Sequence, residues 1–93
     1  MEEKFLKAWF EARSQAEQLG VKLRKLDREN AMREAHRTLS GHRDSEGFGH
    51  LQRINRLDLS LEALAVKAQF TALFNDEEAN NALTRLMDAG YTF

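Results

Sequence analysis

Residues 61–90 read LEALAVKAQFTALFNDEEANNALTRLMDAG, and this stretch decides the fold class. Its first half, 61–74, is apolar on nearly every side, which is typical of a helix at the centre of a core. Asn75 followed three residues later by Glu78 is a capping box, the signature of a helix start. Gly90 closes this last helix. The inner face of that helix is predicted to comprise Ala79, Ala82, Leu83, Leu86 and Met87.

The composition favours helices along the rest of the chain. The 93 residues include no proline, and 42% of them are hydrophobic. Valine and isoleucine, which strands prefer, occur only as Val21, Ile54 and Val66. A chain of this length supports one core. We therefore expect a single all-α domain over residues 1–93, a small bundle of four to five helices with no sheet.

The first helix is predicted over 2–19, because apolar residues recur there at spacings of three and four. Gly20 fits the position after a helix end where φ is positive, and Val21 would then contact Ala16. The same rhythm continues to Leu26, so an unbroken helix over 2–26 is the alternative. Its stripe would then suit a helical homodimer. The stripe within 2–19 comprises Phe5, Trp9, Ala12, Ala16 and Leu19.

Three shorter segments lie between the first helix and the apolar one. Asp27 is a suitable N-cap for a helix over 28–39, which we expect on the surface over the first helix. Residues 40–49, SGHRDSEGFG, are typical of an exposed loop. A short helix over 50–57 would present Leu51, Ile54 and Leu57 on one side.

No catalytic or metal-binding motif is complete. The chain has no cysteine, which excludes thiol catalysis and thiolate zinc sites. Histidine with carboxylate can bind divalent ions, but no two histidines here lie on adjacent turns of one helix. No nucleophile motif or phosphate-binding loop occurs, so we expect neither an enzyme nor a cofactor. A metal site at the histidine loop stays the weakest hypothesis; its residues are His36, His42, His50, Asp44 and Glu46.

Nothing in the sequence indicates export or membrane insertion. Residues 1–7 carry charges on both sides of a two-residue apolar pair, unlike a signal peptide. The apolar stretch 61–74 is too short and too charged to span a bilayer. We therefore expect a small soluble protein of the cytoplasm, without membrane contact.

Charge is distributed unevenly along the chain. Residues 22–56 carry a net charge of +4 and residues 57–93 a net charge of −4. The basic stretch predicts phosphate contacts, which gives nucleic-acid binding as one hypothesis. The isoelectric point near 6.3 and the interspersed acidic residues weigh against it. The candidate phosphate contacts are Lys22, Arg24, Lys25, Arg28, Arg33, Arg37, Arg53 and Arg56.

Protein binding is the hypothesis we favour from the sequence. Aromatic residues are enriched at binding hot spots, and a loop or a chain end is a hard place to bury one. Phe48, Tyr91 and Phe93 are therefore the predicted contacts. The chain is accordingly expected to act as a small non-enzymatic adaptor, inhibitor or regulator, of the kind that phages and plasmids often encode, with another protein as partner.

Overall fold

The computed structural model describes residues 2–91, and its regular secondary structure is entirely helical. No strand occurs in this range, which confirms the all-α prediction. No helix within it is long and apolar enough to cross a membrane. The elements in chain order are α1 (Glu2–Gln18), α2 (Ala31–Ser40), α3 (Phe48–Arg53), the 3₁₀ helix η1 (Leu57–Leu59), α4 (Leu61–Ala65), the 3₁₀ helix η2 (Ala68–Leu73) and α5 (Asp76–Asp88).

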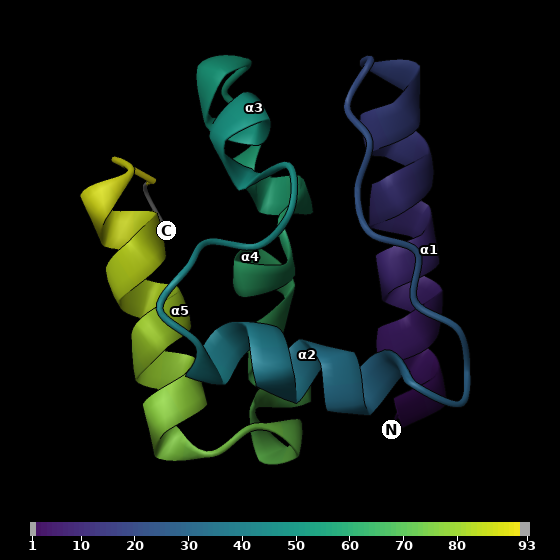
Figure 1. Cartoon of the computed structure of the whole chain (residues 1–93), viewed down its shortest axis with the longest axis vertical. Coiled ribbons are helices and arrows are strands. Elements are labelled where there is room, and N and C mark those ends of the chain that lie inside the picture. The colour runs from purple at the N-terminus through teal and green to yellow at the C-terminus, as the bar shows by residue number, and fades with distance from the viewer. Residues whose placement is uncertain (1, 92–93) are drawn as a thin grey trace.

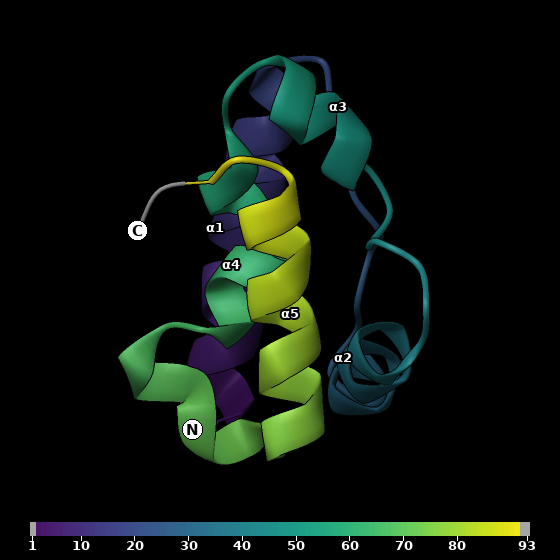
Figure 2. The same ribbon diagram turned by 90° about the vertical axis from the view of Figure 1, so that its left-hand side faces the viewer.

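Three helices form the body of the bundle, and one crosses it. α4 packs between α1 and α5, and α2 runs across this layer and packs mainly on α5 (Figure 1). The turned view shows α2 end-on beside α5, so it covers one side of the layer (Figure 2). The prediction that this helix lies over the first helix is therefore wrong. The chain in residues 21–30, which follows α1, lies there instead.

α4 is the centre of the core. All five of its residues are buried, including the carboxylate residue Glu62. Its first turn is capped by Ser60, whose Oγ accepts the Ala63 N–H at 3.1 Å. A helix with no exposed side needs partners all round, and α1, η1 and α5 supply them.

The single helix predicted over 61–74 is divided in two. The chain bends at Lys67, which has an extended backbone, and continues as the 3₁₀ helix η2. The bend turns Lys67, Gln69 and Thr71 into solvent while α4 stays buried. It also brings Phe70 to Phe5, with the ring centroids 5.3 Å apart. Packing between distant parts of the chain therefore overrides the local helical pattern.

α1 ends at Gly20 as one of the two sequence alternatives predicts. Gly20 has φ of +83°, and its N–H donates to Glu17 O at 3.0 Å. The N–H of Val21 donates to Ala16 O at 2.9 Å, which completes a Schellman motif. An unbroken helix to Leu26 is therefore excluded. The apolar stripe of α1 is buried from Phe5 to Ala16, so this stripe is not an exposed seam for a homodimer.

Residues Val21–Asp27, here called the return segment, run back along α1 without helical structure (Figure 1). Two α1 side chains hold it in place. The indole Nε1 of Trp9 donates to Arg24 O at 3.0 Å, and Arg13 Nε donates to Leu23 O at 3.4 Å. The return segment therefore covers this side of α1, where a bundle would usually place another helix.

α2 begins later than predicted, at Ala31 rather than at residue 28. Asp27 Oδ1 accepts the N–H groups of Glu29 and Asn30, so its side chain stabilises a turn that precedes the helix. Asp27 therefore stabilises this turn through its side chain and is not the N-cap of α2. Asn30 occupies the N-cap position.

α3 also departs from the sequence prediction. It starts at Phe48 instead of His50, and Leu57 belongs to η1 instead of the same helix. Asn55 has φ of +60°, a left-handed conformation that separates the two helices. The loop before α3 is correspondingly shorter than predicted and spans residues 41–47.

α5 confirms the predicted capping box. Asn75 Oδ1 accepts the Glu78 N–H at 2.8 Å, and Glu78 Oε1 accepts the Asn75 N–H at 3.0 Å. Gly90, with φ of +82°, ends the helix, and the Tyr91 N–H donates to Leu86 O at 2.9 Å. Met87 is the exception on the predicted inner face, because 67% of it is exposed.

Candidate binding site: a basic groove

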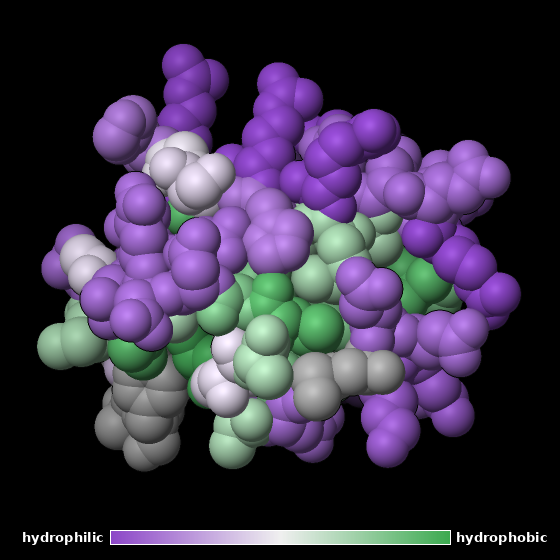
Figure 3. Space-filling view, turned by 90° about the horizontal axis from the view of Figure 1, so that it is seen from below, coloured by the Kyte–Doolittle hydropathy of each residue, from purple (hydrophilic) through white to green (hydrophobic). Residues whose placement is uncertain are grey.

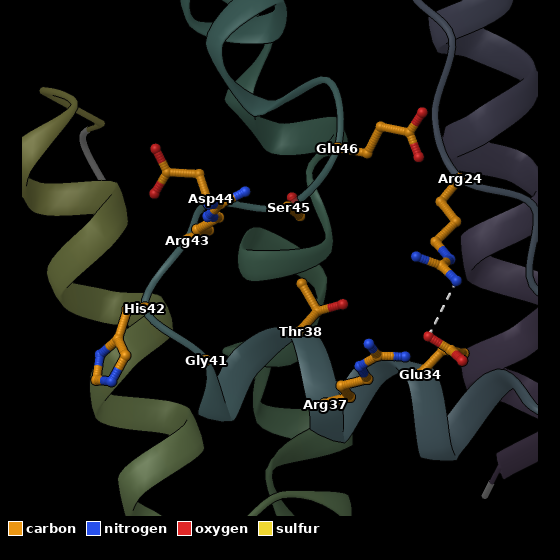
Figure 4. A pocket seen from close by; sticks show the side chains of 10 residues that line it. All are labelled: Arg24, Glu34, Arg37, Thr38, Gly41, His42, Arg43, Asp44, Ser45 and Glu46. Carbon is orange, nitrogen blue, oxygen red and sulfur yellow. Dashed lines mark ion pairs between the residues drawn. The ribbon is translucent and has the colours of Figure 1, made fainter.

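Two adjoining hollows lie on the side of the molecule that α2 covers. The first, about 520 Å³, lies between α2 and the loop 41–47 (Figure 4). The second, about 600 Å³, lies between the C-terminal half of α1 and the return segment. They share Arg24 and Glu46, so we treat them as one surface, the basic groove. Its charged and histidine residues are Arg13, Glu17, Lys22, Arg24, Lys25, Glu34, Arg37, His42, Arg43, Asp44 and Glu46.

Several charges in the groove are paired within the protein. Arg13 Nη2 lies 3.2 Å from Glu17 Oε1. Arg24 Nη2 lies 3.1 Å from Glu34 Oε2 and forms an ion pair with it. The Glu34 Oε2 atom is buried and accepts no hydrogen bond of good geometry from the described residues. Asp44 Oδ1 lies 4.0 Å from Nε of the partly buried Arg85.

The unpaired charges leave the groove positive. Within residues 2–91, Lys22, Lys25, Arg37 and Arg43 form no ion pair or hydrogen bond through their side chains, and Glu46 is the single unpaired carboxylate of the lining. Figure 4 shows Arg37 and Arg43 on opposite walls of the first hollow. Surface cations that have no internal partner are available to an anionic ligand.

A buried network fixes the loop wall of the groove. Glu62, which has no exposed surface, accepts the N–H of Ser45 at 2.9 Å and the Ser45 hydroxyl. Arg85 Nη1 donates to Glu62 Oε2 at 3.3 Å and to Thr38 O at 3.2 Å. Arg85 Nη2 donates to Gly41 O at 2.7 Å. One arginine of α5 therefore joins α4, the end of α2 and the loop, with a carboxylate to balance its charge.

Gly47 brings the loop against the return segment. It has φ of +83°, and a Cβ at this position would lie 2.6 Å from Leu23 Cδ2 and 3.1 Å from Lys22 O. Only glycine fits this close approach without displacement. The contact holds this end of the loop against the return segment.

The structure brings together half of the predicted phosphate contacts. Lys22, Arg24, Lys25 and Arg37 line the groove. The others lie away from it: Arg33 is exposed on α2, Arg53 is exposed on α3, Arg28 lies 4.0 Å from Glu3, and Arg56 pairs with Asp58.

Arg56 is tied to its neighbours and not to the groove. Its Nε donates to Asp58 Oδ1 at 3.0 Å, and its Nη2 donates to Gln15 Oε1 at 3.4 Å. The hydrogen bond and then the charge of Asp58 raise the pKa of Arg56 above its ordinary value. This pair is exposed, so solvent screens it.

Sequence reasoning missed two groove residues. Arg13 lies on α1, outside the basic stretch, and reaches the groove because the return segment folds back beside it. Arg43 lies in the glycine-rich loop, where no periodicity indicated its direction. No local sequence signal identifies either residue, since both depend on contacts between distant segments.

The aromatic residues that the sequence predicts to contact a partner do not form one exposed surface. Phe48 is 2% exposed and belongs to the core, so the expectation that it faces a partner is wrong. Ser45, anchored to Glu62, holds the short loop close to the core and turns Phe48 inward. Tyr91 is half-buried against the core. Phe93 lies outside the described residues.

The histidines do not converge on a metal site. His36 Nδ1 lies 2.7 Å from Glu78 Oε2, with the imidazole against the ring of Phe74. His42 and His50 are exposed on the loop and on α3. No group of three or more potential ligands occurs within residues 2–91, so the weaker metal hypothesis has no site there.

Apolar surface is present away from the groove. Seen from below, hydrophobic side chains gather in the middle of the face where η2 lies, surrounded by hydrophilic ones (Figure 3). Larger exposed apolar residues are scattered over separate elements: Phe10, Leu19, Ile54 and Met87. Scattered apolar residues of this kind are normal on a protein surface.

Comparison with known protein families, with curated protein sequences and with solved structures finds no match to this chain.

Proposed function

We propose that this chain is a small non-enzymatic module that binds an acidic segment of another protein in the basic groove. The observation that carries the proposal is the set of unpaired cations, Lys22, Lys25, Arg37 and Arg43, around one continuous hollow surface. Complementary charge speeds association and selects a partner. The buried Arg85–Glu62 network supports this role, because it holds one wall of the groove in place before any partner binds.

An acidic protein segment fits the groove better than a nucleic acid does. A phosphate backbone carries charge at every nucleotide and favours an uninterrupted basic track. In this groove, Glu46 is unpaired and Glu17 and Asp44 lie on the walls. Arg33 and Arg53, which would extend a track, lie outside it. A peptide can place its carboxylates against the lysines and arginines and leave Glu46 to solvent.

Two labelled probes of equal charge test the proposal. One is a fluorescein-labelled, end-capped octapeptide of alternating glutamate and threonine, and the other is a labelled thymidine pentanucleotide with four phosphodiesters. Fluorescence anisotropy at about 20 mM and about 300 mM salt should show tighter binding of the peptide, weakened by salt since exposed charges are screened. No peptide binding at low salt, or tighter binding of the oligonucleotide, would overturn the proposal.

Charge reversals locate the binding surface. The double variants Lys22→Glu/Lys25→Glu and Arg37→Glu/Arg43→Glu should each weaken peptide binding about tenfold or more, from repulsion in place of attraction. The matched control is Lys7→Glu/Lys67→Glu, which reverses two exposed lysines outside the groove. Equal losses in the control and the groove variants would place the binding elsewhere.

A further inference from the structure

We infer that the return segment is a strand edge, and that the acidic partner docks on it as an added extended strand with backbone hydrogen bonds along Lys22–Leu26. This inference rests on the proposed function and specifies how the partner is held. Strand addition of this kind takes its affinity from main-chain hydrogen bonds and its specificity from alternate side chains.

The path of the return segment requires strand-like spacing. α1 has 17 residues and, at 1.5 Å per residue, is about 25 Å long. The Val21 N–H donates to Ala16 O, and Arg28, directly after the segment, lies 4.0 Å from Glu3, so the seven residues Val21–Asp27 run back past most of α1. Only a chain that advances about 3.3 Å per residue covers such a distance, and that is the rise of a β-strand.

Over Val21–Arg24 its side chains alternate as those of a half-buried strand do. Val21 and Leu23 are buried at 1% and 6% exposure, whereas Lys22 and Arg24 between them are exposed. The alternation ends at Lys25, which is exposed, and Leu26 after it is buried. One face therefore packs on the core, and the other carries positive charge into the groove.

The backbone of this segment has unused hydrogen-bonding groups. In the part of the chain that the structure describes, the N–H groups of Lys22 to Leu26 donate to no residue, and the carbonyls of Lys25 and Leu26 accept from none, whereas the carbonyl of Lys22 lies against Gly47. The carbonyls of Leu23 and Arg24 are the two that α1 side chains engage. Unpaired backbone groups on an extended segment are a template for another chain.

The combination of donors and acceptors identifies the occupant as a peptide. A peptide strand offers carbonyls to the free N–H groups and its own N–H groups to the free carbonyls. A phosphate backbone offers acceptors alone. The positive charges beside the segment belong to Lys22 and Lys25, whose side chains form no ion pair within residues 2–91. These charges favour a strand with acidic side chains. The occupant we infer is therefore an extended acidic peptide segment.

The test alters the peptide and leaves the protein unchanged. The alternating glutamate–threonine octapeptide is compared with the same peptide N-methylated at every residue, which keeps the charges and removes its N–H donors. We expect binding about tenfold weaker or worse for the methylated peptide, because it loses the hydrogen bonds that its N–H groups donate to the free carbonyls of the segment. Hydrogen exchange with the unmethylated peptide bound should slow at alternate amides within Lys22–Leu26, because a strand added at one edge pairs with every second residue, and stay unchanged in α3.

The outcomes separate the two proposals. Equal binding of both peptides overturns strand addition and leaves an electrostatic protein-binding groove standing. Preferential binding of the unmethylated peptide with protection at amides other than 22–26 also overturns the inference. Binding of neither peptide removes the proposed function, and the strand mode with it.

Discussion

The side chain of Arg85 joins three parts of the fold through hydrogen bonds and an ion pair. It donates to two backbone carbonyls at the end of α2 and forms an ion pair with Glu62, and 10% of its side chain is exposed. The carboxylate has no exposed surface. Burying a charge without a partner is costly, so the arginine is needed mainly because the glutamate is there.

Removal of Arg85 should therefore destabilise the fold strongly. Arg85→Met leaves Glu62 buried and without its cation, and we expect a loss of about 3 kcal/mol in the free energy of unfolding. Urea denaturation measures it. The control Arg53→Met, at an exposed residue whose side chain has no partner among residues 2–91, should change stability by less than about 0.5 kcal/mol. A change that small for Arg85→Met would show that the network contributes little.

The two glycines Gly20 and Gly49 should respond oppositely to the same substitution. A Cβ meets nothing within 4 Å at either position, but Gly20 has φ of +83° and Gly49 lies in a right-handed helix. Gly20→Ala should cost about 1 kcal/mol, and Gly49→Ala should gain about 0.5 kcal/mol. Thermal and urea unfolding of both variants give the comparison. A gain for Gly20→Ala would contradict the Schellman ending.

Phe48 shows where residue-level reasoning from sequence fails. Its neighbours are glycines in a polar stretch, which locally indicates an exposed loop. Its burial follows from the bond between Ser45 and Glu62, which are 17 residues apart. Glu62 itself sits within an apolar run and gives no local indication that it accepts three hydrogen bonds in the core.

At the scale of elements, the sequence predicts the capping box of α5 and the glycine end of α1 correctly because these signals are local, whereas Asp27, predicted as the N-cap of α2, lies in the turn before it. The box at Asn75 and Glu78 uses residues three apart, so its geometry is contained in the sequence. The same holds for Gly20 at the end of α1. The bend at Lys67 could not be predicted, since it depends on Phe5 meeting rings from a segment more than 60 positions later.

Two asparagines of one helix give a matched test of the cap. Asn75→Ala removes the side chain that accepts the Glu78 N–H, and we expect a loss of about 1 kcal/mol in the free energy of unfolding. Asn80→Ala, in the exposed middle of α5, should be neutral or slightly stabilising, because alanine favours helix interiors. Comparable losses at both positions would mean that the cap is not the cause.

At the scale of the whole molecule, the groove could be predicted only in part. The basic stretch 22–56 was evident from the sequence, and four of its eight proposed contacts line the groove. The groove also takes Arg13 from α1 and depends on Arg85 from α5. Such a surface exists only after segments far apart in the chain have come together, and no pattern along the sequence encodes it.

The buried stripe of α1 leads to a prediction about assembly. Phe5, Trp9 and Ala16 are each at most 2% exposed within one chain, so a dimer through this stripe would require unfolding. Light scattering should give a mass near 10.7 kDa at micromolar concentration. A mass twice as large would contradict this, and the variants Phe10→Glu and Leu19→Glu would then show whether the exposed apolar residues of this region mediate it.

The hydrogen bonds that join α2 to α5 have a consequence for the chain while it is being translated. The carbonyls of Thr38, Leu39 and Gly41 are bonded by Asn81 and Arg85, residues at least 42 positions later. An isolated helix of ten residues is marginal in water. While the ribosome still holds α5, a nascent chain therefore carries the lysines and arginines of the groove without the groove itself. The groove is therefore complete only when α5 has emerged and packed against α2.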